Sequence, residues 1–237
     1  MATTAAAVVG TAVVAAAGEA GTDGQRRPAV TREPDAEAAL HARLDALCAD
    51  GWAIWERFDG TVRERGFHPF VPADYEVVRA TLLALRAPGR RFLEWGSATG
   101  IITIMADLMG FDAYGIEVDA GLVATAREVA ARHGSGARFV VGSFLPTGYR
   151  WRSADGDGRT GTIARGDSGY QQLGRAPEDF DVVFGYPWGG EAPVMRDVMQ
   201  RYGSPDALLL LFDADGTLQG YRGGRQPVAA DALTAPA

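Results

Sequence analysis

The 237-residue sequence contains no lysine, because all 23 of its basic residues are arginine. Chemistry that depends on a lysine amine, such as a Schiff base or a lysine-containing phosphate loop, is therefore excluded. The single cysteine, Cys48, can neither form a disulfide within the chain nor assemble a thiolate metal site. His41, His68 and His133 lie far apart in the sequence, so we expect no metal site of histidines either. A reducing cytoplasm fits this composition.

The sequence also lacks a surplus of positive charge, since 30 acidic residues give it a formal charge of −7. Proteins that follow nucleic-acid phosphates usually carry a basic surplus, so a nucleic acid is disfavoured as a partner and a small molecule or protein is favoured. The apolar stretch 4–17 is shorter than the roughly 20 residues that span a bilayer, and no basic residue precedes it as in a secretory signal. We therefore expect no membrane span and interpret 1–34 as a disordered N-terminal segment, with a targeting signal over 4–17 as the alternative that stays open.

Apolar spacing predicts a helical segment over residues 35–90 that packs on the rest of the chain. Its first helix begins at Asp35 and runs to about Ala49, and Asp74 caps its second helix. Residues 91–222 then alternate strand and helix patterns, which predicts an α/β fold with a doubly wound, mostly parallel sheet covered by helices on both faces. The expected strands are 91–95, 113–118, 138–141, 181–184 and 208–212, with a short sixth strand near 217–221. Helices are expected near 101–108 and from Asp119, which caps the helix, through Ala131.

Two stretches are expected to lie outside the regular core. Residues 149–174 are rich in glycine, aspartate and arginine and lack apolar periodicity, so they predict a polar surface loop inserted between the third and fourth strands. Residues 223–237 predict a disordered tail.

The strongest motif lies where the first strand turns into a helix and reads Glu94-Trp95-Gly96-Ser97-Ala98-Thr99-Gly100. Glycine or alanine lets a ligand approach the backbone because no large side chain blocks it, and the N–H groups of the following helix then face that ligand. Glu117 lies 17 residues after Gly100 and ends the second strand. A carboxylate at this place can accept hydrogen bonds from both ribose hydroxyls of an adenosine-containing ligand.

The pattern Glu94-x-Gly96-x-Ala98-x-Gly100 resembles the first motif of class I methyltransferases, E/D-x-G-x-G-x-G, with alanine at the middle glycine. The resemblance covers about residues 91–212. It implies an S-adenosyl-L-methionine-dependent methyltransferase in which this loop, with Ser97, packs against the methionine part of the cofactor. Glu94 would orient the loop or bind the methionine ammonium through ordered water.

The same resemblance assigns further cofactor contacts. It implies that Glu117, with Val118 beside it, holds the ribose. It also places Gly142-Ser143-Phe144 beside the adenine, where Ser143 stands in place of the common aspartate. Few residues follow Phe212, so the usual final hairpin of this fold is expected to be missing.

A third motif, Gly185-Tyr186-Pro187-Trp188, follows the fourth strand. Ligands bind beyond the carboxyl ends of strands in such sheets, so we expect this segment, Gly185 included, to face the cofactor and the transferring methyl. Tyr186 and Trp188 are candidate aromatic walls for a cationic sulfonium or a stacked acceptor, although ordinary core contacts would also explain them.

The third motif is also similar to the N-P-P-F/Y motif of amino-group methyltransferases, but Gly185 has no side chain that could accept from an amine. Transfer to the amino group of a nucleobase is therefore weakly indicated. His68 is a candidate general base, with an ordinary loop residue as the alternative.

Three other interpretations remain open. The dinucleotide fingerprint G-x-G-x-x-G fits poorly, because Ala98 and Ile101 occupy two of its glycine positions, and this disfavours an NAD-dependent oxidoreductase. A non-catalytic module that binds an adenosine ligand would keep the loop and lack an acceptor pocket. Aminopropyl transfer is the weakest interpretation. Such an enzyme would need acidic residues near the carboxyl end of the fourth strand to hold a polyamine, and Asp181 lies at the start of that strand. The identity of the methyl acceptor does not follow from the sequence.

Overall fold

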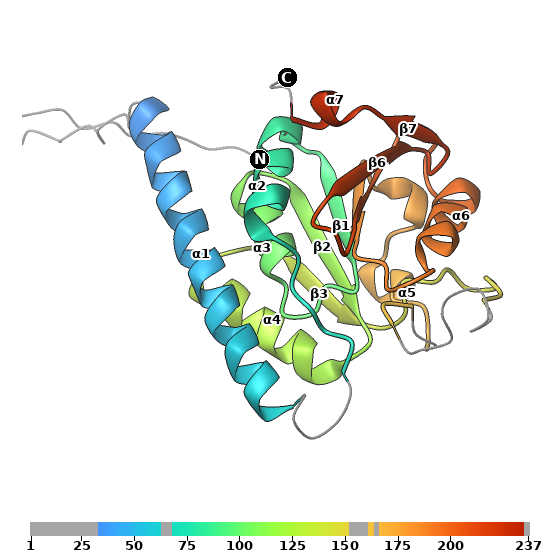
Figure 1. Cartoon of the computed structure of the whole chain (residues 1–237), viewed down its shortest axis with the longest axis horizontal. Coiled ribbons are helices and arrows are strands. Elements are labelled where there is room, and N and C mark those ends of the chain that lie inside the picture. The colour runs from blue at the N-terminus through green and yellow to red at the C-terminus, as the bar shows by residue number, and fades with distance from the viewer. Residues whose placement is uncertain (1–32, 63–67, 152–160, 164–165, 235–237) are drawn as a thin grey trace, which may run out of the picture.

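The computed structural model describes residues 33–62, 68–151, 161–163 and 166–234 (Figure 1). The segment 1–34, for which the sequence predicts disorder, lies outside these residues except for its last two positions, which begin the first helix. Within the described ranges, none of the helices combines the length and apolar character that a membrane crossing requires.

One sheet organises the structure, and its seven strands lie in the order β3-β2-β1-β4-β5-β6-β7. The strands are β1 Arg91–Trp95, β2 Asp112–Glu117, β3 Arg138–Val141, β4 Val182–Gly185, β5 Leu208–Phe212, β6 Leu218–Arg222 and β7 Gln226–Val228. β1 to β5 are parallel, whereas β6 runs antiparallel to β5 and β7 antiparallel to β6. The chain moves outward in one direction from β1 to β3 and then returns to β4 on the other side of β1. This reversal creates a crevice at the carboxyl ends of β1 and β4, where open α/β sheets bind ligands.

Helices cover both faces of this sheet (Figure 1). They are α1 Glu33–Thr61, α2 Tyr75–Leu85, α3 Ile101–Leu108, α4 Ala120–Arg132, α5 Tyr170–Leu173, α6 Ala192–Tyr202 and α7 Ala230–Thr234. Neighbouring strand residues point to opposite faces, as the period of two requires. Thus Phe92 and Phe184 pack into a core shared with α1 to α4, while Leu93 and Val183 pack into a second core shared with α6. The predicted fold class is confirmed.

Several elements have the bounds that the sequence predicts, namely β1, β3, β5 and α3. Asp74 and Asp119 cap α2 and α4 through their side chains. The first helix differs, because it continues as one helix from Glu33 to Thr61. Gly51 lies inside it, and a Cβ there would approach Ile101 Cγ1 to 2.9 Å and Tyr75 Cε2 to 3.0 Å. The glycine therefore marks a close contact of α1 and not its end.

The C-terminal region contradicts two expectations. A final hairpin, β6 and β7, is present where the sequence predicts none, and α7 follows in place of the disordered tail expected over 223–237. The structure describes this region as far as residue 234. Gly223 and Gly224 make the turn with positive φ angles of 53° and 69°. Leu233, only 3% exposed, packs over Gly220 and fixes α7 on the sheet.

The insert over 149–174 also differs from a purely polar surface loop. Residues 152–160 and 164–165 lie outside the described part of the chain, but Ile163 and Tyr170 are buried in the second core. Tyr170 begins α5, and its hydroxyl accepts a hydrogen bond of 2.8 Å from the indole N–H of Trp95 in β1. The insert is thus anchored to the sheet by residues whose spacing shows no periodic pattern.

Candidate functional site

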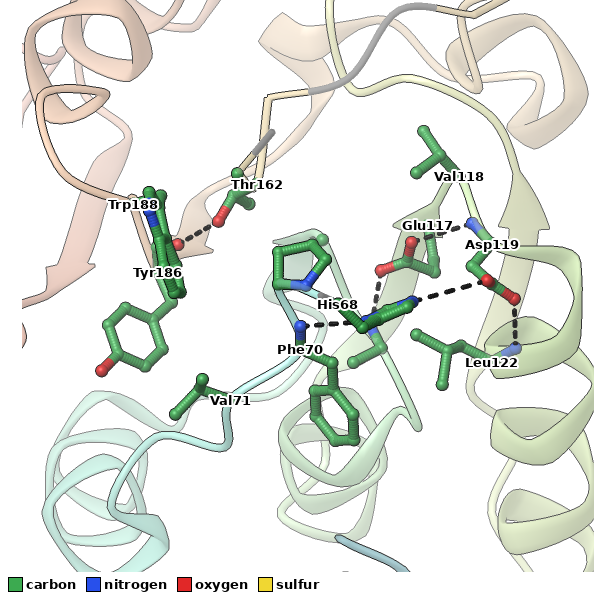
Figure 2. Close-up of a pocket in the computed structure, with 14 residues that line it drawn as sticks. His68, Phe70, Val71, Glu117, Val118, Asp119, Leu122, Thr162, Tyr186 and Trp188 are labelled. Carbon is green, nitrogen blue, oxygen red and sulfur yellow. Dashed lines mark hydrogen bonds and ion pairs between the residues drawn. The ribbon is translucent and has the colours of Figure 1, made fainter. Parts of the chain in front are cut away.

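A cavity of about 450 Å³ lies at the carboxyl ends of β1, β2 and β4 (Figure 2). Its walls come from segments that are far apart in the sequence, which are His68 to Val71, Gly96 with Ala98, Glu117 to Asp119 with Leu122, Gly161 with Thr162, and Tyr186 with Trp188. This is the crevice that the strand order creates next to β1. The structure therefore brings seven of the predicted site residues to one cavity, namely His68, Gly96, Ala98, Glu117, Val118, Tyr186 and Trp188.

The loop after β1 has the conformation that its glycine spacing predicts. Gly96, Ala98 and Gly100 all have positive φ angles, of 74°, 43° and 78°. Among the described residues other than glycine, Ala98 is the only one in this conformation, which L-residues disfavour. Gly100 does not line the cavity, because it is the point where α3 meets β3 and a Cβ there would lie 2.6 Å from Phe139.

Glu94 connects the end of β1, before this loop, to the first turn of α3, after it. Its buried carboxylate accepts hydrogen bonds from both the backbone N–H and the hydroxyl of Thr103, in the first turn of α3. Burial raises the pKa of Glu94 to about 8; the Thr103 hydrogen bonds oppose this shift, and the negative charge of Glu117 adds to it. Glu94 and Ser97 line a smaller adjoining cavity of about 40 Å³. The hydroxyl of Ser97 is buried and has no hydrogen-bond partner within the described residues.

Glu117 stands at the end of β2 and is itself held by backbone groups. Its Oε2 accepts a hydrogen bond of 3.0 Å from the N–H of Ala98, and its Oε1 accepts one of 2.9 Å from the N–H of Asp119. Burial raises the pKa of Glu117, although these backbone hydrogen bonds oppose the shift. A carboxylate has about four acceptor positions, so Glu117 can still accept from a ligand in the cavity.

His68 closes the same end of the cavity from the N-terminal segment (Figure 2). Its Nδ1 accepts a hydrogen bond of 3.1 Å from the N–H of Phe70, which leaves the proton of the neutral ring on Nε2. Nε2 lies 3.6 Å from the Asp119 carboxylate. Burial alone would raise the pKa of Asp119, but the N–H groups of Leu122 and Gly121, together with His68, lower it below its ordinary value. Both ring nitrogens of His68 are therefore engaged.

The opposite end of the cavity is aromatic. Figure 2 shows Tyr186 and Trp188 on the side away from Glu117, with Thr162 between the two ends. Tyr186 packs edge-on against Phe212 at 5.1 Å between ring centroids. The hydroxyl of Thr162 donates to the backbone carbonyl of Tyr186.

Besides Gly100, Glu94 and Ser97, four further predicted contacts are not brought to this cavity. Ser143 is 1% exposed, because its N–H and carbonyl pair with Asp167 and Gly169 of the insert. Gly142 packs against the same insert residues, and Phe144 stacks on Trp95 at 4.9 Å. The insert therefore covers the segment for which the resemblance implies adenine contact. Gly185 is buried at the end of β4, where a Cβ would lie 3.0 Å from the sulfur of Met195.

No sequence pattern marks several of the lining residues. Val71 and Leu122 resemble ordinary apolar positions, and Asp119 was identified as a helix cap alone. Gly161 and Thr162 belong to an insert with no periodic pattern, although a Gly-Thr-Ile run within a polar stretch hints at a buried anchor. Within the described ranges, no three His, Cys, Asp or Glu side chains gather in a way that could hold a metal ion.

No protein-family model matches the chain, and no curated protein matches it. Solved structures are similar in part. An RNA methyltransferase from Salinibacter ruber in complex with S-adenosyl-L-homocysteine is 22% identical, with 60% of this chain and 76% of that chain covered and a TM-score of 0.45. A precorrin-6y C5,15-methyltransferase from Geobacter metallireducens is 17% identical, with 62% and 66% covered and a TM-score of 0.42.

A third similar structure is the tRNA (uracil-54, C5)-methyltransferase of Pyrococcus abyssi in complex with S-adenosyl-L-homocysteine. It is 16% identical, with a TM-score of 0.39. This chain covers 60% of its own length and 28% of that chain.

Proposed function

We propose that this protein is an S-adenosylmethionine-dependent methyltransferase. The observation that carries the proposal is the position of Glu117, which lies at the end of β2, is tied to the N-terminal loop of α3 by the Ala98 N–H, and lines the main cavity. A carboxylate at this place recognises a ribose diol. The resemblance of Glu94-x-Gly96-x-Ala98-x-Gly100 to the first motif of class I methyltransferases supports the choice of S-adenosylmethionine among adenosine ligands.

The residues of the cavity suit this cofactor. The free acceptor positions of Glu117 would take the ribose hydroxyls, and the loop at Gly96 and Ala98 presents backbone without bulky side chains to the amino-acid part. Val118 is 40% exposed, although it is apolar, and it lies beside Glu117 in the cavity wall. An exposed apolar residue in a concave site is suited to the face of an adenine. We therefore propose that adenine lies between Val118 and Leu122, and not at Gly142 to Phe144.

When bound, the cofactor would supply an electrophilic methyl on a sulfonium. The protein then has to orient the acceptor and exclude water, since in-line transfer depends mainly on positioning. Tyr186 and Trp188 provide the flat apolar wall against which we propose that the acceptor lies. Because both nitrogens of His68 are engaged, we propose that His68 holds Asp119 and closes the ribose end, and that it does not act as a general base.

The acceptor is proposed to be a small molecule or a protein side chain that reaches the aromatic end, in the cytoplasm. Among the described lining residues the ionisable groups are Glu117, Asp119, His68 and Tyr186, so no arginine stands ready for a phosphate. A non-catalytic adenosine-binding module is the second candidate, and it would bind the cofactor without turning it over.

The test is calorimetric titration of the protein with S-adenosylmethionine, S-adenosylhomocysteine and NAD. We expect the first two to bind and NAD to give no heat. Glu117→Ala should lower the affinities for S-adenosylmethionine and S-adenosylhomocysteine by roughly 10- to 100-fold, since hydrogen bonds to charged groups contribute about 1.5–3 kcal/mol each. Glu128→Ala changes an exposed glutamate on α4 and should leave the affinities unchanged.

Binding of NAD alone, or equal affinity of the Glu117→Ala variant and the wild type, would contradict the proposal. Binding without methyl transfer to any class of acceptor would favour the adenosine-binding module.

A further inference from the structure

Residues 161–163 form a short strap in the wall of the cavity, next to the loop after β1. Thr162 lines the cavity, and a Cβ on Gly96 would lie only 2.6 Å from its Cγ2, so the methyl of Thr162 rests on the Gly96 backbone. Ile163 is 1% exposed and anchors one end of the strap in the second core. The strap is therefore a packed wall of the site.

One buried side chain, Glu191, accepts hydrogen bonds from two backbone N–H groups of this strap. Its Oε2 accepts a hydrogen bond of 3.0 Å from the N–H of Thr162, and its Oε1 accepts one of 3.0 Å from the N–H of Ile163. Oε2 also accepts one of 2.8 Å from the N–H of Trp188, in the aromatic wall. Glu191 is 2% exposed. One carboxylate thus joins the insert to the segment that follows β4.

Glu191 occupies the position of a helix cap and does not act as one. It precedes α6, yet its side chain makes no capping hydrogen bond to that helix and is directed to the strap instead. Burial of a carboxylate costs free energy of folding unless the group is hydrogen-bonded. The hydrogen bonds to the strap and to Trp188 therefore compensate the burial of Glu191. Gly161 confirms how closely the parts fit, since a Cβ there would approach Trp188 Cβ to 2.5 Å.

The strap lies over one half of the cavity only. Figure 2 shows Thr162 toward Tyr186 and Trp188, away from Glu117 and Leu122. In the proposed function, which this inference rests on, the ribose and adenine lie at Glu117, and the amino-acid part lies along Gly96. The strap would therefore contact the amino-acid half of the ligand and make no contact with its adenosine half.

We propose that Glu191 is a positioning residue, which holds the 161–163 strap against Gly96 and thereby forms the wall for the amino-acid half of the cofactor. Loss of the hydrogen bonds between Glu191 and the strap, here called the clasp, should weaken the binding of ligands that carry the amino-acid chain. The binding of ligands that lack this chain should be unchanged. This difference separates positioning from a general effect on stability.

The experiment compares calorimetric affinities for S-adenosylhomocysteine and for adenosine. In Glu191→Gln the carboxamide keeps the shape but points an NH2 group at backbone donors, so the Kd for S-adenosylhomocysteine should rise at least about tenfold, as expected for a lost charge-assisted hydrogen bond. The Kd for adenosine should stay within about twofold of the wild type on the same scale.

Two variants of Thr162 test the strap independently of Glu191. Thr162→Val removes the hydroxyl that donates to the Tyr186 carbonyl and should weaken S-adenosylhomocysteine selectively. Thr162→Ser keeps that hydroxyl but removes the methyl that rests on Gly96, so it should lose part of the affinity for S-adenosylhomocysteine and none of the affinity for adenosine. Asp107→Asn is the matched control, because Asp107 also clasps a loop, through Ser135 and Gly136, near the far end of α3.

Amide hydrogen exchange gives a second readout of the clasp. Exchange at Thr162, Ile163 and Trp188 should accelerate in Glu191→Gln while the strands of the sheet stay protected. Unchanged or tighter binding of S-adenosylhomocysteine to Glu191→Gln and Thr162→Val, or an equal loss of adenosine binding, would overturn the inference alone. A wild-type protein that binds neither ligand would overturn the proposed function and this inference with it.

Discussion

Ala98 is the residue at which the loop after β1 carries backbone strain. Its φ of 43° is left-handed, and the cost of this conformation for an L-residue is roughly 1–2 kcal/mol. Glycine adopts the same conformation without the clash of a Cβ. The alanine therefore lowers the stability of the protein at the point where the backbone turns toward the cavity.

We expect Ala98→Gly to raise the free energy of unfolding by about 1 kcal/mol, because relief of the strain exceeds the added entropy of the unfolded glycine. Urea unfolding would show this as a higher midpoint. Ala124→Gly, at an exposed position of α4, is the control and should lower the free energy of unfolding by about 1 kcal/mol. A loss of stability in both variants would show that Ala98 is not strained.

Glu94 makes the stability of the protein depend on pH. Its pKa is about 8 in the folded protein against 4.5 for the ordinary group, so the folded state keeps a proton that the unfolded state releases. The stability contribution is complete below about pH 4.5 and is lost as the pH rises toward about 8. The slope is at most about 1.4 kcal/mol per pH unit for one proton.

Glu94→Gln removes this titration. We expect the variant to gain stability relative to the wild type as the pH rises through that range, which urea titrations at a series of pH values would measure. Thr103→Val removes a donor that favours the charged form and so raises the pKa of Glu94 further, which means that its stability should keep falling to a higher pH than that of the wild type. Parallel curves for Glu94→Gln and the wild type would contradict the raised pKa.

At the scale of elements, the β6–β7 hairpin and α7 form one unit with the sheet. Leu233 of α7 is 3% exposed and packs over Gly220 of β6, where a Cβ would lie 2.9 Å from its Cδ2. The glycine gives the leucine its space, so the hairpin and the helix depend on each other. The region thereby becomes part of the first core.

Leu233→Ala should lower the free energy of unfolding by about 2–4 kcal/mol, as expected for removal of a buried leucine. Thermal unfolding followed by circular dichroism would measure the change. Gln226→Ala alters an exposed residue of β7 and should leave the stability within about 0.5 kcal/mol of the wild type. A negligible effect of Leu233→Ala would mean that α7 does not contribute to the core.

Sequence periodicity was sufficient where an element is strongly patterned. The five parallel strands and α3 follow from apolar runs such as Leu208–Phe212 and from the glycine motif after β1. Sequence periodicity was insufficient where a single contact between distant residues decides whether a segment is helical. Gly51 allows α1 to continue because Ile101 and Tyr75 lie against it, and Leu233 orders the C-terminal region by contact with β6. Neither contact is local in sequence.

The candidate site divides in the same way. Glu117, Gly96 and the aromatic pair Tyr186 and Trp188 were found from the rule that ligands lie at the ends of strands. The structure places these residues around one cavity, and their roles toward a ligand stay a proposal. Thr162 and Glu191 could not be found, because their pairing joins the insert to the segment after β4 across 29 residues.

At the scale of the whole molecule, the cavity exists only when the fold is complete. Its walls come from residues near 68, 96, 117, 162 and 186, and none of these described segments supplies more than four of its lining residues. A ligand of this cavity must therefore bind the native state and leave the unfolded chain untouched. The free energy of unfolding should then increase by about 2.7 kcal/mol at a ligand concentration of 100 times the Kd, and the melting temperature should rise with it. Candidate acceptors can thus be ranked by heating the protein with each of them, before any product has been identified.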